Sequence, residues 1–379
     1  MPRSHVVVES PIRSSFRVDQ VRGMFDVPDK VAIRHEWDVD IPIESQAWTI
    51  GVIVGPSGSG KTTIGRRLFP GARFHVGYDW PEDAAIVDAF PADLDGKAIT
   101  GALSAVGFSS PPHWLKRFCH LSNGQKFRCE LARLMLESDD TVIVDEFTSV
   151  VDRDSAKVSS AAASKAIRRR KSPRLIALTC HYDVIDWLDP DWIYDTANAS
   201  FSWRSLQGRP EIRLDIHKAD RRAWSLFRGH HYLSRDINDS AQCFVATWNG
   251  NPVAFTSYMH FPHATARNIK REHRTVVLPD FQGVGIGNRL SDWLGGWLVS
   301  QGWRFRSVTS HPSMIAYRSR SLLWRRESLG FMTQHTAKHK SMNGGIGLSK
   351  TQASAMKRSS SANRLTASFE YVGPPCTQA

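Results

Sequence analysis

A glycine-rich loop in the first quarter of the chain carries the residue types needed to hold a phosphate chain. It reads GPSGSGKT over residues 55–62 and follows an apolar stretch, Trp48–Val54, that is typical of a buried strand. Glycines let successive backbone N–H groups curl around phosphate oxygens. Lys61 would reach the β- and γ-phosphates, and the Thr62 hydroxyl would hold Mg²⁺. The predicted nucleotide-binding residues are Gly55, Ser57, Gly58, Gly60, Lys61, Thr62 and Thr63.

A second apolar stretch ends in two carboxylates. Residues 141–144 read TVIV and are followed by Asp145 and Glu146. Behind a phosphate-binding loop, this pattern has the form of a Walker B strand. It predicts that Asp145 holds Mg²⁺, together with Thr62, and that Glu146 polarises the water that attacks the γ-phosphate.

The segment Leu121–Gln125 (LSNGQ) resembles the LSGGQ signature of ABC-type ATPases, with Asn123 in place of the first of two adjacent glycines. It precedes a predicted helix, Lys126–Leu136, and the N–H groups at a helix N-terminus suit a γ-phosphate. The resemblance implies that Ser122 and Gly124 bind ATP. It also implies an ATP-dependent homodimer, in which each nucleotide lies between one chain's phosphate loop and its partner's signature.

The resemblance covers roughly residues 5–200 and implies three further roles. Asp152 ends a segment that looks like the family's D-loop and would contact ATP. His181 follows a predicted strand, Leu175–Leu178, where the family places its catalytic switch histidine. Phe25 precedes the loop at about the distance expected for the ring that stacks on adenine; the alternative is a core phenylalanine.

The sequence departs from the ABC pattern between the loop and the signature. Only 63 residues separate Lys61 from Gly124, and no glutamine stands between Lys61 and Gln125 to serve as the Q-loop residue. Asp79 and Asp88 are possible replacements. Because this segment couples transporter ATPases to their membrane partner, we expect a soluble, nucleic-acid-associated type of ABC ATPase.

A second anion-binding pattern occurs in the other half of the chain. Residues 276–290 read VVLPDFQGVGIGNRL, which predicts a strand, a proline, a glycine-rich loop and a helix. The N–H groups of such a loop and helix start can hold a pyrophosphate. The order resembles motif A of the GNAT acyltransferases, which implies binding of an acyl-CoA, here taken as acetyl-CoA. The residues that match are Gln282, Gly283, Gly285 and Gly287.

The residues that would transfer the acyl group are less well defined. Many GNAT enzymes carry a tyrosine five residues before the phenylalanine of a Gly-Phe pair, where it protonates the leaving thiolate. Arg326 stands there in this chain, and the nearest alternatives are Tyr317 and the pair Ser310-His311. Side chains that could act as general base by their type are His231, Glu272, His273 and His311.

The stretch His230–Ser234 (HHYLS) resembles the Mom-type DNA-modifying branch of the GNAT fold, in which a His-Tyr pair precedes a strand beginning Cys-Phe, as Cys243-Phe244 does here. That resemblance implies that His231 and Tyr232 lie at the reaction centre. The alternative is a pair at a helix end that packs on the core.

These motifs require two domains. Strands that alternate with helical stretches in the first half predict a mostly parallel α/β sheet. We expect an ABC-type P-loop domain over residues 1–205 and an α+β GNAT-fold domain over residues 206–379. Within the second domain we predict a hairpin at Asn249-Gly250, helices over Gly287–Val299 and Met314–Leu329, a flexible basic segment over residues 333–364 and a last strand near residues 365–371.

Charge is divided unequally between the two halves. Residues 1–200 hold 24 basic and 27 acidic residues, whereas residues 201–379 hold 25 basic and 10 acidic ones. Arginines cluster in the second half with Trp224, Trp303 and Trp324 nearby, a composition suited to phosphates and unstacked bases. We therefore expect nucleic acid as a partner of the C-terminal half.

The composition also limits the location of the protein. No apolar stretch is long enough for a membrane helix, and the N-terminal residues lack the apolar region of a secretory signal. The five cysteines are widely spaced, without a C-x-x-C pair. We expect a cytoplasmic protein with no membrane partner and no disulfides.

Three functions fit these patterns. The first is an ATPase coupled to an N-acyltransferase that modifies nucleic acid. The second is a nucleotide-driven DNA-binding or repair ATPase whose GNAT fold is a non-catalytic binding module. The third is an N-acetyltransferase for a small amine or a protein. Arg326 favours the second, and the intact acyl-CoA loop favours the other two.

Overall fold

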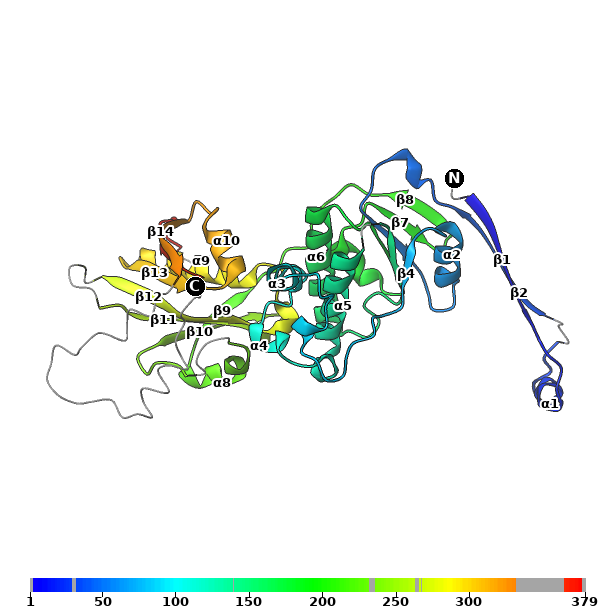
Figure 1. Cartoon of the computed structure of the whole chain (residues 1–379), viewed down its shortest axis with the longest axis horizontal. Coiled ribbons are helices and arrows are strands. Elements are labelled where there is room, and N and C mark those ends of the chain that lie inside the picture. The colour runs from blue at the N-terminus through cyan, green and yellow to red at the C-terminus, as the bar shows by residue number, and fades with distance from the viewer. Residues whose placement is uncertain are drawn as a thin grey trace. The chain divides into compact units, whose positions relative to one another are not determined.

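The computed structural model of the chain describes residues 3–28, 32–138, 140–231, 236–262, 266, 268–331 and 365–376. The chain forms two compact units (Figure 1). The first comprises residues 1–211 and Pro279–Val284, and the second comprises Ile212–Leu278 and residues 285–379. The predicted flexible segment 333–364 lies outside the described residues.

The first unit is an α/β domain built on a six-stranded sheet in the order β4-β5-β6-β3-β7-β8. Its strands are parallel except for β8, which runs antiparallel to β7. The strands of this sheet are β3 (Ile50–Val54), β4 (Arg73–His75), β5 (Val142–Val144), β6 (Leu175–Thr179), β7 (Trp192–Asp195) and β8 (Ser200–Trp203). Its helices are α2 (Lys61–Leu68), α3 (Gly96–Ala105), α4 (Pro111–Trp114), α5 (Asn123–Glu137), α6 (Arg153–Arg170) and α7 (Ile185–Leu188).

Both faces of this sheet are covered, which explains why β3, β5 and β6 are apolar throughout. One face packs on α3, α5 and α6, and the other packs on α2 and on the base of a two-stranded hairpin. The hairpin pairs β1 (Arg3–Pro11) with β2 (Ala32–Asp40), and helix α1 (Phe16–Phe25) lies between its two strands in the chain. No residue of α1 is buried.

The second unit is a seven-stranded sheet in the order β14-β15-β13-β12-β11-β10-β9. Helix α9 packs on one face and α8 on the other. The strands are β9 (Asp215–Ala219), β10 (Gln242–Trp248), β11 (Asn251–His260), β12 (Ile269–Val277), β13 (Arg304–Thr309), β14 (Trp324–Phe331) and β15 (Leu365–Tyr371). The helices are α8 (Trp224–Phe227), α9 (Ile286–Ser300) and α10 (Pro312–Arg318).

Two predicted features of this unit have different outcomes. The hairpin at Asn249-Gly250 is confirmed, because β10 and β11 pair antiparallel across a turn in which both residues have positive φ. The predicted helix Met314–Leu329 is wrong beyond Arg318. Residues 324–331 form β14, which pairs with β15, so a partner strand far along the chain overrides the local pattern.

Among the described residues, no helix is long and apolar enough to cross a membrane.

Candidate functional site

The phosphate-binding loop lies between the end of β3 and the start of α2, as the sequence predicts. Lys61 is buried, and its Nζ donates to the carbonyl oxygens of Gly55 at 2.9 Å and Pro56 at 2.7 Å. Gly58 has φ +78°, with open space where a side chain would begin. The ammonium group therefore sits inside the loop on weak neutral acceptors, which a phosphate could replace.

Two predicted metal ligands meet at the carboxyl edge of the sheet. The Thr62 hydroxyl donates to Asp145 Oδ2 at 2.8 Å. They come together because β3 and β5 run parallel, separated by β6, so their ends lie at one edge. A hydroxyl beside a carboxylate, next to a phosphate loop, is a donor set that suits Mg²⁺.

The two predicted catalytic residues of the ATPase follow neighbouring strands. Glu146 is exposed, has φ +50°, and accepts a hydrogen bond from the Ser149 hydroxyl at 2.5 Å. His181 comes two residues after β6, and its backbone N–H donates to Thr179 Oγ1 at 3.1 Å. Both thus follow the edge of the sheet that carries Asp145.

The signature residues begin helix α5. Ser122 is its N-cap and forms a reciprocal capping box with Gln125, with both hydrogen bonds at 3.3 Å. Gly124 is buried in the first turn. Asp152 in turn caps α6 by accepting from the Ser155 N–H at 3.0 Å. Within one chain, the side chains of Ser122 and Asp152 thus serve as helix caps. Their predicted roles toward ATP remain proposals.

The structure places a different aromatic ring beside the phosphate loop from the one proposed. Phe25 ends α1, beyond the strands of the hairpin, and is 70% exposed. Trp37 of β2 instead packs on the loop, because a β-carbon on Gly60 would lie 2.6 Å from its ring. Trp37 also stacks on His35, with ring centroids 5.8 Å apart. Trp37 was not predicted from the sequence, because the pairing of β2 with β1, and not distance along the chain, places its ring beside the loop.

The segment after β4 contains Asp79 and Asp88, the two possible replacements for the Q-loop glutamine. It begins with Val76, which is 81% exposed, and Gly77, which has φ +106°. Neighbouring residues converge on Glu130 of α5, which accepts from Trp80 Nε1 at 2.6 Å and pairs with His75 at 2.9 Å. Asp79 lies in an irregular part of this segment and Asp88 ends a short turn, Ile86–Asp88, so the choice between them stays open.

In the second unit, two neighbouring parallel strands separate after a short ladder. β12 pairs with β13 over three residues, Ile269–Arg271 with Arg304–Arg306. Beyond it, β12 stays paired with β11, and β13 with β15. The register with β11 shifts at His273, a bulge of the kind that bends a strand and often lies near active sites. We call this divergence the fork; an extended polar chain could enter it, because the facing edges of β12 and β13 have no opposite strand there among the described residues.

The glycine loop after β12 is divided between two environments. Gly285 is the N-cap of α9, with φ +94° and open space where a β-carbon would stand. Gly287 lies in the first turn of α9. Gln282 belongs to the first unit, where its Oε1 accepts from the Ser109 N–H at 2.9 Å. Gly283 also belongs to the first unit and packs there within contact of Gly107 and Ala162. Gly285 and Gly287 thus keep the geometry of an anion site, whereas Gln282 and Gly283 are engaged in packing.

Comparisons with known proteins find one family match and several distant structural similarities. Residues 201–318 match the acetyltransferase (GNAT) family. Solved structures similar to the chain include the IAA acetyltransferase from Bacillus cereus, with 16% identity and a TM-score of 0.30 over 42% of this chain and 99% of that chain. They also include the ribosomal-protein-S18-alanine N-acetyltransferase from Escherichia coli, with 15% identity and a TM-score of 0.29 over 44% and 96%. A dimeric bacterial ABC transporter cassette shares 13% identity with a TM-score of 0.33 over 45% and 89%. Comparison with curated proteins finds no match.

Two of the candidate general bases in residues 201–318, His231 and His273, already contact other parts of the protein. His231 is buried, with its ring 5.6 Å from that of Trp224, and Tyr232 lies outside the described residues. His273 Nε2 accepts from the Asn238 N–H at 3.1 Å, and burial, with Arg274 and Arg271 nearby, lowers its pKa to about 4. His273 is therefore neutral at physiological pH, with one ring nitrogen already occupied.

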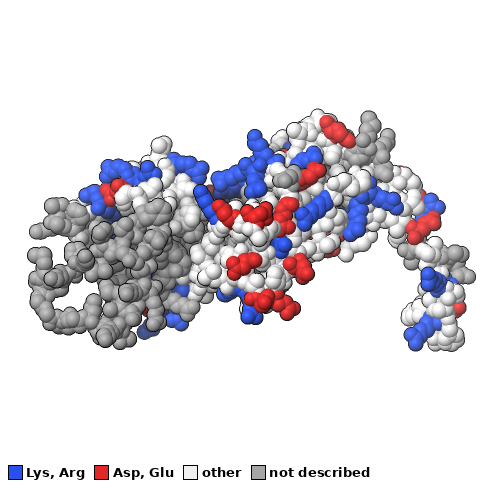
Figure 2. Space-filling model, in the orientation of Figure 1, with Lys and Arg blue, Asp and Glu red and all other residues white. Residues whose placement is uncertain are grey.

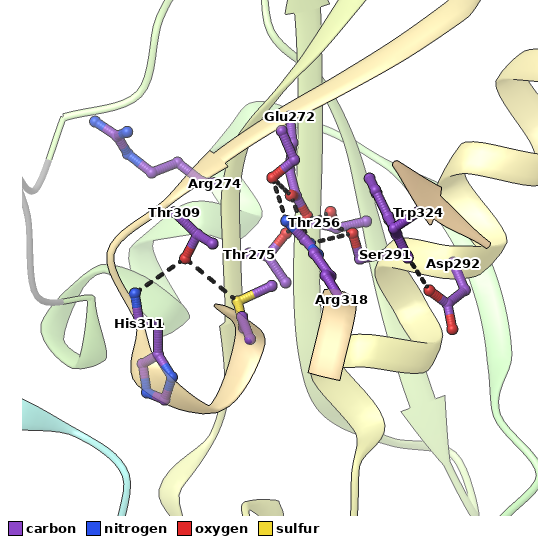
Figure 3. A network of polar contacts seen from close by, with 12 residues as sticks. Thr256, Glu272, Arg274, Thr275, Ser291, Asp292, Thr309, His311, Arg318 and Trp324 are labelled. Carbon is purple, nitrogen blue, oxygen red and sulfur yellow. Dashed lines mark hydrogen bonds and ion pairs between the residues drawn. The ribbon is translucent and has the colours of Figure 1, made fainter. Parts of the chain in front are cut away.

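Two of the candidates predicted from the sequence, Glu272 and Tyr317, belong to a buried polar cluster in the same region. Glu272 of β12 pairs with Arg318 of α10 at 2.9 Å, and both side chains are almost fully buried (Figure 3). Asp292 of α9 accepts from Trp324 Nε1 at 2.7 Å and from the Tyr317 hydroxyl. The signal available in the sequence was a Tyr-Arg pair in a predicted helix, but its two carboxylate partners lie 46 and 25 residues upstream.

A second carboxylate forms ion pairs with arginines of β13 and β14. Glu370 of β15 accepts from Arg304 at 2.6 Å and from Arg325 at 2.9 Å, and Arg306 lies 3.8 Å away. Hydrogen bonds from Arg304 in particular lower the pKa of Glu370 to about 2. Part of the positive charge that was expected to bind nucleic acid is therefore paired with Glu370 within the sheet of the second unit.

On the visible face of the first unit, Figure 2 shows basic and acidic side chains interspersed.

Proposed function

We propose that the second unit is an acetyl-CoA-dependent N-acetyltransferase. The family match over residues 201–318 supports this, and the observation that carries it is the course of the chain from β12 through Gly285 into α9. That course presents backbone N–H groups at a helix start, a site suited to pyrophosphate. Bound acetyl-CoA would supply an activated acetyl group. The chain would bind its phosphates at α9 and orient its extended arm along the fork.

One side chain of the GNAT region is suited to hold the proton that a leaving thiolate needs. Tyr317 is half-buried, and burial together with the hydrogen bond to Asp292 raises its pKa, so its hydroxyl is protonated at neutral pH. Arg326, at the position where many GNAT enzymes carry tyrosine, is exposed and has no hydroxyl group. We therefore propose Tyr317 as the proton donor; its hydroxyl donates to Asp292 in this structure and would have to turn toward the thiolate to act.

Calorimetry with acetyl-CoA tests this function directly. We expect saturable binding by the full-length protein, with one site per chain. A wild-type protein that shows no heat of binding at millimolar acetyl-CoA would exclude the acetyltransferase function and favour a second function, a non-catalytic binding module. That alternative is favoured by Arg326 and by the engagement of Glu272 and His273 in other contacts.

We further propose that the first unit is an ABC-type ATPase that dimerises on binding ATP. The support is the meeting of Thr62 with Asp145 beside the loop of Lys61, and the LSNGQ segment at the start of α5. Light scattering on the Glu146→Gln variant tests it. We expect a dimer with ATP and Mg²⁺ and a monomer without them; a strict monomer with saturating nucleotide would contradict the proposal.

The acceptor of the acetyl group is proposed to be nucleic acid, as in Mom-type modification. The support is the excess of 25 basic over 10 acidic residues in positions 201–379. We expect affinity for DNA or RNA that falls steeply with salt. Replacing Arg325 and Arg326 by alanine should reduce the salt slope by about one to two contacts. Arg304→Ala, which removes a partner of Glu370, is the matched control. Absence of binding at about 50 mM salt would favour a small amine or protein as acceptor.

A further inference from the structure

Side chains close the narrow end of the fork between β12 and β13. The backbone ladder ends with Arg271 opposite Arg306. The next residue is Glu272 on β12 and Ser307 on β13, and the Ser307 hydroxyl donates to Glu272 Oε2. At the point where backbone pairing stops, a side-chain hydrogen bond thus takes over the connection between the two strands.

Arg318 ties this point to the helices. Its guanidinium donates to Glu272 Oε2 at 2.9 Å, to Ser291 Oγ of α9 at 2.7 Å and to Ser307 Oγ of β13. Glu272 also accepts from Ser291 at 2.9 Å and from Thr275 at 2.6 Å. Figure 3 shows Glu272, Thr275, Ser291 and Arg318 converging from strand and helices on one point. Four elements, β12, β13, α9 and α10, therefore meet at one ion pair.

The chemistry of the cluster excludes a role for Glu272 as general base. Burial acts to raise its pKa, but the charge of Arg318 and the hydroxyls of Ser307, Thr275 and Ser291 outweigh burial and hold the pKa below its usual value. The carboxylate is thus ionised, and its oxygens already accept from Arg318 and three hydroxyls. A base needs a free lone pair directed at its substrate, and Glu272 has its lone pairs directed into the protein.

We propose that the Glu272–Arg318 pair is a positioning element that sets the width of the fork, and that neither residue touches substrate. The proposal rests on the acetyl-CoA function proposed above. It follows from the place of the pair: next to the last backbone pair of the ladder and just before the bulge at His273 that turns β12 away. An extended CoA arm would lie between the two diverging edges, and its amides fit there only when the edges stand at a defined separation.

A double substitution separates positioning from stability. Replacing a buried ion pair by apolar residues of similar size often leaves a protein as stable or more stable, whereas removing one partner leaves an unpaired charge. We therefore compare one double variant, which carries both Glu272→Met and Arg318→Met, with two single variants, Glu272→Gln and Arg318→Lys. Asp239→Asn, which breaks the exposed Arg221–Asp239 pair in the same unit, is the control.

The measurements are the acetyl-CoA dissociation constant by calorimetry and the melting temperature. We expect the single variants to melt lower and to bind acetyl-CoA more weakly. The double variant should regain the melting temperature of the wild type yet still bind acetyl-CoA at least about tenfold more weakly, because a misplaced site loses binding without losing its fold. Asp239→Asn should change neither quantity.

Two outcomes overturn the inference, and they are distinguishable from failure of the proposed function. If the double variant binds acetyl-CoA as tightly as the wild type, the pair is structural and does not position the site. If Glu272→Gln and Arg318→Lys bind normally, the same conclusion follows. If the wild type itself does not bind acetyl-CoA, the acetyltransferase proposal fails, and the positioning role fails with it.

Discussion

The Thr62 hydroxyl donates a hydrogen bond to Asp145 across 2.8 Å, although 83 residues separate them in the chain. The contact links the phosphate loop to the strand that precedes Glu146. The ends of parallel strands bring them together, so the contact depends on the order of β3, β6 and β5 in the sheet. A cation that enters between hydroxyl and carboxylate would replace one hydrogen bond by two metal contacts.

The first prediction concerns nucleotide binding and hydrolysis. Lys61→Ala removes a charged donor to the phosphates and should weaken ATP binding roughly 10- to 100-fold. Glu146→Gln should retain binding but reduce turnover by about 10² or more, since general base catalysis is lost. Filter binding and phosphate release measure the two effects. Unchanged turnover in both variants would remove these residues from the mechanism.

The second prediction distinguishes Trp37 from Phe25 as the ring that stacks on adenine. Trp37→Ala should weaken ATP binding by about 1–3 kcal/mol, the range for stacking of one base. It should have little effect on inorganic triphosphate, which has no base. Phe25→Ala is the matched control, because its ring is 70% exposed at the end of α1. Equal losses in the two variants, measured by fluorescence titration, would argue against the role of Trp37.

The third prediction concerns the start of α9. Gly285 has φ +94° and nothing within 4 Å of the position of a β-carbon. Gly285→Glu would bring a bulky negative charge to the place where pyrophosphate must approach bare backbone, so acetyl-CoA binding should be lost. Gly302, with φ +80° and equally open surroundings after α9, provides the control as Gly302→Glu. If both variants bind acetyl-CoA alike, Gly285 is not part of the site.

The fourth prediction is a pH dependence of stability. The pKa of His273 falls from 6.5 to about 4, chiefly through burial, so the unfolded chain binds this proton more readily than the folded one. Its contribution to stability is therefore complete above pH about 6.5 and is lost as pH falls toward 4. His273→Gln should flatten this part of the stability curve in urea titrations. His217→Gln, on the exposed side of β9, should leave it unchanged.

The sequence predicts best where function depends on backbone geometry and neighbouring residues. The loop 55–62, the Asp145-Glu146 pair and the start of α9 all lie in the predicted strand-loop-helix context. Prediction fails where the structure depends on contacts between segments that are far apart in the chain. Trp37 reaches Gly60 through hairpin register, β14 forms because β15 pairs with it, and Glu272 becomes a buried ion pair because α10 supplies Arg318. None of these relations leaves a periodic trace in the local sequence.

The order of strands in the second unit has a consequence for the synthesis of the chain. β15 lies between β13 and β14 in the sheet, although it follows both in the sequence. During translation, β13 and β14 emerge from the ribosome first and have no partner for their facing edges until residues 365–371 appear. Unpaired edges of this kind invite association with other chains. A nascent chain arrested within residues 332–364 would therefore leave the facing edges of β13 and β14 unpaired by β15, and the sheet closes only when β15 is inserted between strands made before it.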